Sequence, residues 1–202
     1  MSPSAIPLCT RRFFLWITLT LLAAGCTSTT VTFHTAGIEP PLCRASAKGE
    51  KAVVYWGAAW RQDQKEVARR EAIAAKGIED FFLREPCVSV KAISRTIDGR
   101  DVLLLGDKEV LASVSRDIDR IHIIRFEELG PVLVFYLSPI LWTSDLNIDV
   151  RIRTLNVRTG ILESDVTAHW RKGGPFNFRG VNGLPEDLAE TLQVIFRDQP
   201  AR

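Results

Sequence analysis

Residues 148–170 read IDVRIRTLNVRTGILESDVTAHW, and apolar and polar residues alternate along both halves of this stretch. Such alternation is typical of a β-strand with one buried face. Between the halves, Arg158, Thr159 and Gly160 predict a tight turn in which the glycine takes the left-handed conformation of a G1 bulge. The stretch is therefore a predicted β-hairpin with one face in the core, and it decides the fold.

The register of this hairpin follows if Val157 pairs with Ile161. The apolar residues at 148, 150, 152, 166, 168 and 170 then share one face, and the polar residues at 149, 153, 165 and 169 share the other, which cross-strand pairing favours. The predicted pairs are Ile148 with Trp170, Val150 with Ala168, Ile152 with Val166, Arg153 with Asp165, and Asp149 with His169.

The chain around the hairpin predicts an α+β fold with one mixed sheet. Two apolar strands are separated by one helix, so they are expected to lie parallel through a right-handed crossover. A second helix, a four-strand antiparallel meander and a C-terminal helix follow, with the helices mainly on one face of the sheet. The predicted strands are 52–56, 88–93, 119–128, 131–142, 145–157 and 161–171, and the predicted helices are 62–84, 107–118 and 184–196.

The stretch from Pro131 to Trp142 is apolar at both odd and even positions. A central strand that is covered on both faces has this pattern. The alternative is a strand with one face left for a partner or a lipid. A lipid or lipopolysaccharide carrier would need a deep apolar cavity beside this strand.

The first 25 residues form a predicted export signal. Arg11 and Arg12 precede an apolar run over 13–22, and Ala23, Ala24 and Gly25 lead to Cys26. Basic residues, a short apolar run and small residues before a cleavage site are the parts of a secretory signal. Residues 22–26 resemble the lipobox of bacterial lipoproteins, which implies that Cys26 receives a diacylglycerol and, with it, a stable membrane anchor.

The residue after Cys26 is Thr27 and not aspartate. By resemblance to lipoprotein sorting in enteric bacteria, this favours the outer membrane, on its periplasmic side, over retention at the inner membrane. Residues 10–15 also resemble a twin-arginine export signal, although two arginines alone suffice to make a leader positive. The export route stays open at this point.

Residues 26–50 are predicted to be the lipidated N-terminus and a tether, and residues 51–198 a single domain. Residues 30–33 alternate and form a short strand in the other interpretation. The mature chain has two further cysteines, Cys43 and Cys87, which predict a disulfide in an oxidising compartment. The alternative is two free, buried thiols.

At this point the order of elements resembles a group of envelope lipoproteins that includes the curli-secretion lipoprotein and the activator lipoproteins of penicillin-binding proteins. The likeness rests on the strand 148–157, the turn Arg158-Thr159-Gly160 and the strand 161–170. It implies a fold and an envelope location, and it implies no activity.

Catalytic motifs are sparse in the sequence, which has no Gly-x-Ser-x-Gly and no His-Glu-x-x-His. His34, His122 and His169 are scattered along the chain, and each is predicted to be a surface or cross-strand residue and not a metal ligand. A small envelope hydrolase would use His169 oriented by Asp149, with Thr167 or Ser138 as the nucleophile. We expect no enzyme activity, no metal and no cofactor.

Charge also restricts the partners. Cleavage removes Arg11 and Arg12 from 26 basic residues and none of the 24 acidic ones, so the mature chain carries 24 of each. A nucleic-acid partner is not expected, because it requires a clustered basic surface.

One loop is a candidate partner-binding site. Phe176, Phe178 and Arg179 lie in the stretch 172–180, where aromatic residues alternate with small and polar ones between basic residues. The two rings either pin the loop to the core or serve as exposed anchors for a partner. The sequence thus predicts a membrane-anchored accessory lipoprotein that binds another envelope protein, with a hydrolase or a lipid carrier as alternatives.

Overall fold

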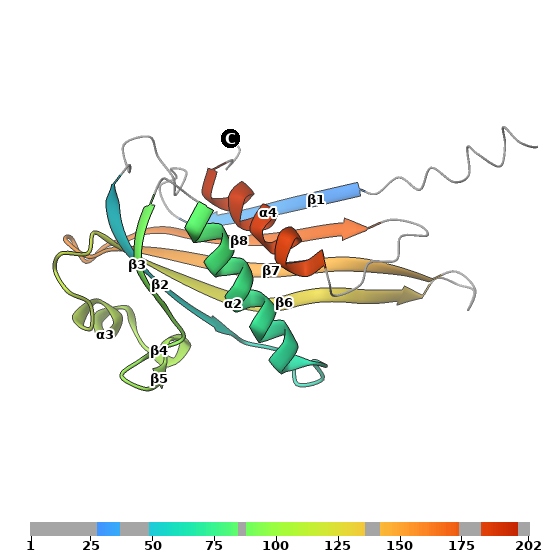
Figure 1. Cartoon of the computed structure of the whole chain (residues 1–202), viewed down its shortest axis with the longest axis horizontal. Coiled ribbons are helices and arrows are strands. Elements are labelled where there is room, and N and C mark those ends of the chain that lie inside the picture. Colours follow the sequence, from blue (N-terminus) through green and yellow to red (C-terminus); the bar gives the residue numbers. More distant parts are fainter. Residues whose placement is uncertain (1–27, 37–48, 85–87, 136–141, 174–182, 198–202) are drawn as a thin grey trace, which may run out of the picture.

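A six-stranded mixed sheet forms the centre of the computed structural model, which describes residues 28–36, 49–84, 88–135, 142–173 and 183–197 (Figure 1). The strand order is β1-β8-β7-β6-β2-β3. The strands are β1 (Ser28–Ala36), β2 (Glu50–Ala58), β3 (Val88–Ser94), β6 (Arg120–Phe135), β7 (Trp142–Asn156) and β8 (Leu162–Gly173); a small pair is formed by β4 (Thr96–Ile97) and β5 (Arg100–Asp101). The helices are α2 (Val67–Arg84), α3 (Asp107–Ala112), α4 (Leu184–Arg197) and the 3-10 helix η2 (Val102–Leu104).

The predicted α+β class is confirmed. β2 and β3 run parallel, as expected for two strands joined by one helix, and β2 is also parallel to β6. β7 is antiparallel to both β6 and β8, and β8 is antiparallel to β1.

The predicted register of the β7–β8 hairpin is confirmed for all five cross-strand pairs, from Ile148 with Trp170 to Arg153 with Asp165. The predicted closing pair of the hairpin, Val157 with Ile161, was wrong. Leu155 pairs with Leu162, and the Asn156 N–H donates to Ile161 O, because Glu163 is an extra residue in a bulge. The bulge lets the Glu163 carboxylate accept from Arg120 Nε at 2.7 Å and from Asn156 Nδ2 at 2.8 Å. Gly160 has φ +69°, as the turn requires.

The meander contains three strands in place of the four predicted. The segments 119–128 and 131–142 were expected as two strands, but β6 is continuous through Gly130 and Pro131. A proline is tolerated here because β2 pairs with β6 only as far as Phe126, so the later part of β6 has one strand neighbour. The chain adjusts at this point through a bulge between Phe126 and Glu128.

The segment 26–50 is not only a tether. Residues 28–36 form β1, which pairs antiparallel with β8 over nine positions, from Ser28 with Gly173 to Ala36 with Asp165. The short strand that the alternation at 30–33 indicated is therefore present and longer than expected. It is the edge strand of the sheet.

Two helices are shorter than predicted. α2 begins at Val67 and not at residue 62, because Glu66 has φ +55°, a left-handed conformation that interrupts a helix. α3 ends at Ala112, where Ser113 Oγ bonds to the Val110 carbonyl at 2.7 Å. α4 has the bounds expected to within one residue. In the part of the chain that the structure describes, no helix is long and apolar enough to cross a membrane.

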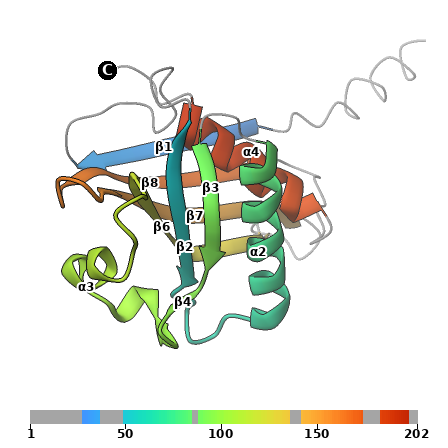
Figure 2. The same ribbon diagram turned by 60° about the vertical axis from the view of Figure 1, so that its left-hand side comes forward.

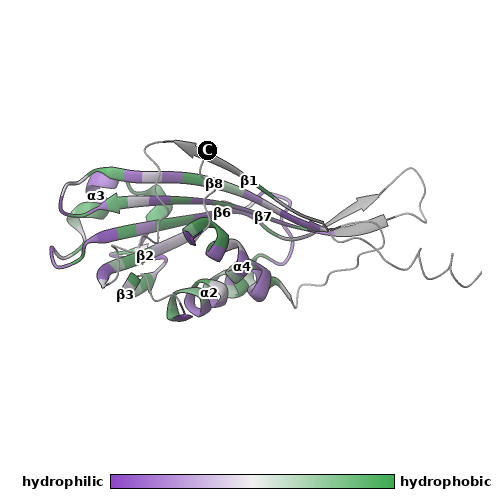
Figure 3. Ribbon diagram, turned by 90° about the horizontal axis from the view of Figure 1, so that it is seen from above, coloured by the Kyte–Doolittle hydropathy of each residue, from purple (hydrophilic) through white to green (hydrophobic). Residues whose placement is uncertain are grey.

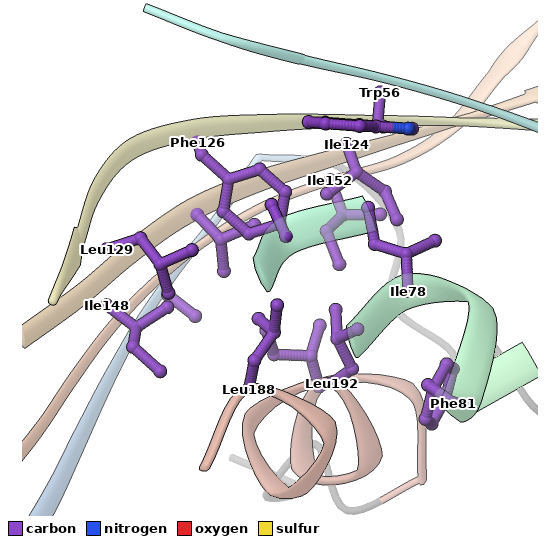
Figure 4. Close-up of a cluster of buried hydrophobic side chains, with 14 of the residues drawn as sticks. Trp56, Ile78, Phe81, Ile124, Phe126, Leu129, Ile148, Ile152, Leu188 and Leu192 are labelled. Carbon is purple, nitrogen blue, oxygen red and sulfur yellow. The ribbon is translucent and has the colours of Figure 1, made fainter. Parts of the chain in front are cut away.

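One face of the sheet is covered by α2 and α4 (Figures 1 and 3). The even-numbered residues of β7 and β8 point into this layer and are at most 2 % exposed from Ile148 to Ile152 and from Val166 to Trp170. α2 and α4 contact each other closely at Gly77, where a Cβ would lie 2.6 Å from Leu188 Cδ2. Figure 4 shows the resulting cluster, to which both helices and the strands contribute Trp56, Ile78, Phe81, Ile124, Phe126, Leu129, Ile148, Ile152, Leu188 and Leu192.

A second, smaller core lies on the other face, at one end of the sheet (Figure 2). η2 and α3 place Val102 and Val110 over the strand residues Tyr55, Ile121 and Leu155. The described elements cover this face only at that end, and the remaining part carries the candidate site.

Candidate functional site

The part of the second face that the described elements leave uncovered is a polar surface on β6, β7 and β8, which we call the open face. Because strand residues alternate between faces, the neighbours of the buried core residues point outward here. The open face comprises Arg125 and Glu127 of β6, Asp149, Arg151 and Arg153 of β7, and Asp165, Thr167, His169 and Arg171 of β8.

Ion pairs hold the side chains of the open face in place. Arg151 Nε donates to Asp165 Oδ1 at 2.7 Å, and a second bond joins its Nη2 to Oδ2. The hydrogen bond to Asp165 raises the pKa of Arg151 above its ordinary value. Such two-pronged contacts fix the guanidinium plane more firmly than a single bond does. The face therefore presents an ordered pattern of charges.

Arg153 lies opposite Asp165 in the register, as predicted, but its guanidinium turns to another partner. It donates to Asp107 at the start of α3, at 2.5 and 2.6 Å. Arg125 and Arg151 face each other across β6 and β7, and Glu127 lies 3.4 Å from Arg125. Each arginine named here has a carboxylate close by, so positive charge does not accumulate on the open face.

The predicted contact between His169 and Asp149 is present. Nδ1 of His169 lies 2.9 Å from Asp149 Oδ1, and the two side chains are 46 % and 35 % exposed. The contact orients the imidazole, which is what a general base needs. Thr167 lies two residues away on the same strand and face, whereas Ser138 lies outside the described residues. Of the two nucleophiles predicted for a hydrolase, only Thr167 therefore lies among the described residues.

A buried carboxylate marks one end of the open face. Asp145 is 2 % exposed, and Arg171 Nε donates to its Oδ2 at 3.0 Å. A Cβ at Gly173 would lie 2.1 Å from Asp145 Oδ1, so only glycine leaves room for this carboxylate. Sequence reasoning missed this arrangement, although a glycine in a strand signals a close approach.

A second buried pair joins α2 to the edge of β6. Arg70 Nη1 lies 3.3 Å from Glu128 Oε1, and Arg61 and Gln64 also contact this carboxylate at 3.0 and 3.1 Å. Arg70 Nε donates to Lys65 O at 2.9 Å, and Gly130 makes room for the guanidinium, since a Cβ there would lie 2.0 Å from Nη1. Arg70 is thus a buried charged residue of α2.

His122 is a buried cross-strand residue. Its Nδ1 lies 3.0 Å from Thr154 Oγ1, and its ring packs against Phe82 and Phe196. Burial, with a smaller contribution from the positive charge of Arg120, lowers the pKa of His122 to about 4. The ring is therefore neutral at pH 7. Among the described residues, no group of three or more His, Cys, Asp or Glu side chains could hold a metal ion.

The helix-covered side has a shallow pocket of about 400 Å³ between α2 and α4. Arginines, carboxylates and Phe81 are among its lining residues. The pocket contains none of the predicted site residues; its lining is Asp80, Phe81, Arg84, Glu186, Ala189, Glu190, Gln193 and Arg197.

No model of a known protein family matches the sequence, and no curated protein is significantly similar to it. Several solved structures are similar in fold. The PelC dodecamer from Paraburkholderia phytofirmans has a TM-score of 0.43 and 13 % identity, covering 85 % of this chain and 100 % of that one. Lipoprotein GNA1162 from Neisseria meningitidis has a TM-score of 0.45 and 14 % identity, covering 71 % and 94 %.

A third similar structure is the hypothetical protein CT253 from Chlamydia trachomatis, with a TM-score of 0.45, 6 % identity, and coverage of 73 % of this chain and 98 % of that one. At these values the likeness is distant, and any function has to be argued from this chain's own residues. The resemblance to curli-secretion and penicillin-binding-protein-activator lipoproteins stays a prediction.

Several predicted site residues lie outside the described residues. They are the lipid-attachment residue Cys26, the possible disulfide partners Cys43 and Cys87, and the possible partner-binding residues Phe176, Phe178 and Arg179. These assignments stay predictions from the sequence.

Proposed function

We propose that this chain is an accessory lipoprotein of the bacterial cell envelope that binds another envelope protein through the open face. The observation that carries the proposal is the unequal covering of the sheet. α2 and α4 bury one face across the strands, whereas η2 and α3 cover the other face only at one end. Within the part of the chain that the structure describes, a sheet surface of ordered polar side chains thus stays available to a partner.

The chemistry of the open face favours a protein partner over a lipid. Paired Arg and Asp side chains, with His169 among them, present fixed donors and acceptors to a surface of matching charge. Complementary charges of this kind contribute specificity and association rate more than affinity. The open face has no cluster of unbalanced basic residues, so it does not suit a polyanion.

The proposed anchor is the diacylglycerol on Cys26, with palmitate as an added acyl chain and the periplasmic side of the outer membrane as the location. The leader, the lipobox-like residues 22–26 and Thr27 support this assignment. Replacing Cys26 with alanine is expected to release the chain into the soluble periplasmic fraction. Retention of the Cys26→Ala chain in the membrane fraction would contradict the anchor.

Crosslinking in the native host tests the partner. Cells expressing the full chain are treated with a crosslinker, and the crosslinked peptides are identified by mass spectrometry. We expect reproducible crosslinks to one envelope protein, and we expect Arg151→Glu to abolish them because it repels Asp165 and disrupts the face. Glu79→Arg, an exposed reversal on α2, is the matched control and should preserve them. Crosslinks that survive Arg151→Glu would refute the open face as the site.

The contact between His169 and Asp149 favours one second candidate, a small envelope hydrolase with Thr167 as nucleophile. Thr167→Ala and His169→Ala test it together. A hydrolase activity of the wild-type chain on ester or amide substrates that both variants lose would support it. An activity that both variants retain would remove these residues from the reaction.

A further inference from the structure

The groove between α2 and α4 lies on the helix-covered side of the sheet, opposite the open face. Figures 1 and 2 show the two helices side by side. They run in the same direction, because Gly77 lies against Leu188, and farther along both helices the rings of Phe81 and Phe196 are 5.2 Å apart. The last turns of the two helices therefore lie at the same end of the groove, which contains the pocket of about 400 Å³.

The charges that line the groove are separated along it. Arg84 and Arg197 are the basic residues in the last turns of α2 and α4, whereas Glu186 lies in the first turn of α4. At 1.5 Å per residue, Glu186 and Arg197 are about 16 Å apart along the helix axis. The groove therefore has a basic end and an acidic end.

Two of these charges lack a partner within the described part of the chain. Neither Arg84 nor Glu186 forms an ion pair with another described residue, although both line the pocket. Asp80 and Glu190, which lie between the two ends, each accept a hydrogen bond from a lysine, at 3.0 and 2.9 Å. The two uncompensated charges of the groove are thus opposite in sign and lie at opposite ends.

The basic end of the groove also carries an exposed apolar side chain. Leu83, the residue before Arg84, is 83 % exposed, whereas Phe81 in the lining of the pocket is 5 % exposed. Covering an apolar side chain of this size stabilises a complex more than an exposed ion pair does. A partner that covers this end can therefore gain both apolar burial and a compensated charge.

We propose that the α2–α4 groove binds the same groove of a second copy of this chain, with the two copies antiparallel. A two-fold axis then crosses the middle of the groove, so Arg84 of each copy meets Glu186 of the other. The occupant is a second copy because this arrangement compensates both charges at once. A parallel arrangement would place the two Arg84 side chains together, and such like-charge contacts are unfavourable.

The size of the surface indicates how firmly the two copies bind. α2 and α4 have 18 and 14 residues. With helices about 10 Å wide and a rise of 1.5 Å per residue, they offer a footprint of roughly 500 Å² per copy. Interfaces of standard size bury about 800 Å² per partner. We therefore expect a reversible dimer.

Charge reversal tests this arrangement. The full chain is purified in a mild detergent with two tags of different mass, and dimers are counted by native mass spectrometry. Arg84→Glu and Glu186→Arg should each weaken self-association about 100-fold, because like charges then meet twice in each dimer. When the two variants are mixed, they should form a heterodimer, since every contact again joins opposite charges.

Three further measurements separate binding from folding. Leu83→Asp should weaken the dimer while the urea midpoint of the chain stays unchanged, because this side chain is exposed in the single chain. The two charge reversals should also keep the wild-type urea midpoint. Arg116→Glu, a reversal at an exposed residue between α3 and β6, is the matched control and should keep the dimer.

Several results would overturn the proposal. They are a wild-type chain that stays monomeric at the highest attainable concentration, a dimer that survives either reversal, and two reversed variants that do not combine. A different protein found in the groove in place of a second copy would also refute it. None of these results bears on the open face, so the proposed function is tested separately.

Discussion

The two faces of the same strands are stabilised by different interactions, apolar packing on one and ion pairs on the other. On the helix-covered face, residues such as Ile148, Val150 and Ile152 are at most 1 % exposed and pack against α2 and α4. On the open face, Asp149 and Arg151 alternate with them and rely on ion pairs that water still reaches. Apolar burial stabilises far more than exposed ion pairs do. Stability is thus concentrated on one face, and the ion pairs of the other face contribute little to it.

The largest expected effect comes from breaking the helix-covered core. Phe196 is fully buried between the rings of Phe81, Phe82 and His122. Phe196→Ala should lower the free energy of unfolding by about 4 kcal/mol, from lost burial and the cavity left behind. Urea denaturation followed by circular dichroism measures this. A loss below that of a surface substitution such as Glu79→Ala would mean that α4 contributes little to the core.

The next largest effect on the free energy of unfolding is expected from the buried ion pair of Arg70 and Glu128 on the helix-covered side. Removing one member of a buried pair leaves the other charge uncompensated, so Arg70→Met should cost about 3 kcal/mol. The Arg70 and Glu128 side chains are 11 % and 10 % exposed. Replacing both, as Arg70→Met with Glu128→Leu, should recover most of the loss. If the double variant is as unstable as the single one, the packing of the guanidinium against Gly130 matters more than its charge.

The stability of the helix-covered core should also depend on pH, through the buried His122. Its pKa is about 4 when folded, because burial disfavours the charged ring, against 6.5 for an ordinary histidine. The unfolded chain therefore binds more protons between these values, and stability falls as the pH drops from about 6.5 to 4. From pH 7 to pH 5 the loss from this residue is about 2 kcal/mol. Urea denaturation at both pH values should show a smaller loss in His122→Leu than in wild type, and an equal loss would contradict it.

The smallest effect is expected on the open face. The Arg151 and Asp165 side chains are 43 % and 10 % exposed, and such a pair contributes about 0.5 to 1 kcal/mol. A double-mutant cycle with Arg151→Ala and Asp165→Ala measures this coupling by urea denaturation. The coupling should weaken in high salt. A coupling above that for Arg70 and Glu128 would reverse the contrast between the faces.

The hairpin could be predicted because its information is local. A period of two and a turn glycine determine which residues share a face, so the pairing of Ile148 with Trp170 followed from the sequence. The bulge at Glu163 could not be predicted in this way, because its reason is Arg120, 43 residues away. Likewise, Gly130 and Pro131 have the local pattern of a turn, and only the end of β2 pairing shows why a strand tolerates them.

The candidate site was predicted only in part. The contact between His169 and Asp149 followed from the register. The carboxylates of Asp145 and Glu128 are buried by contacts from Arg171, Gly173, Arg70 and Gly130, which become neighbours only in the folded sheet. The sequence predicts a tether where β1 lies, because the Ser and Thr residues of β1 give a weak strand signal. Its partner β8 lies near the other end of the sequence.

The pairing of β1 with β8 has a consequence for the order in which the strands of the sheet pair during folding. Ser28 and Gly173 are neighbours in the sheet although 145 positions separate them in the chain (173 − 28). The entropy of closing so large a loop must be overcome before the pair stabilises anything, so contacts of this span form late and slowly. The β1 edge of the sheet is consequently the last to close, and a chain still being synthesised carries its first strand unpaired until its eighth has followed.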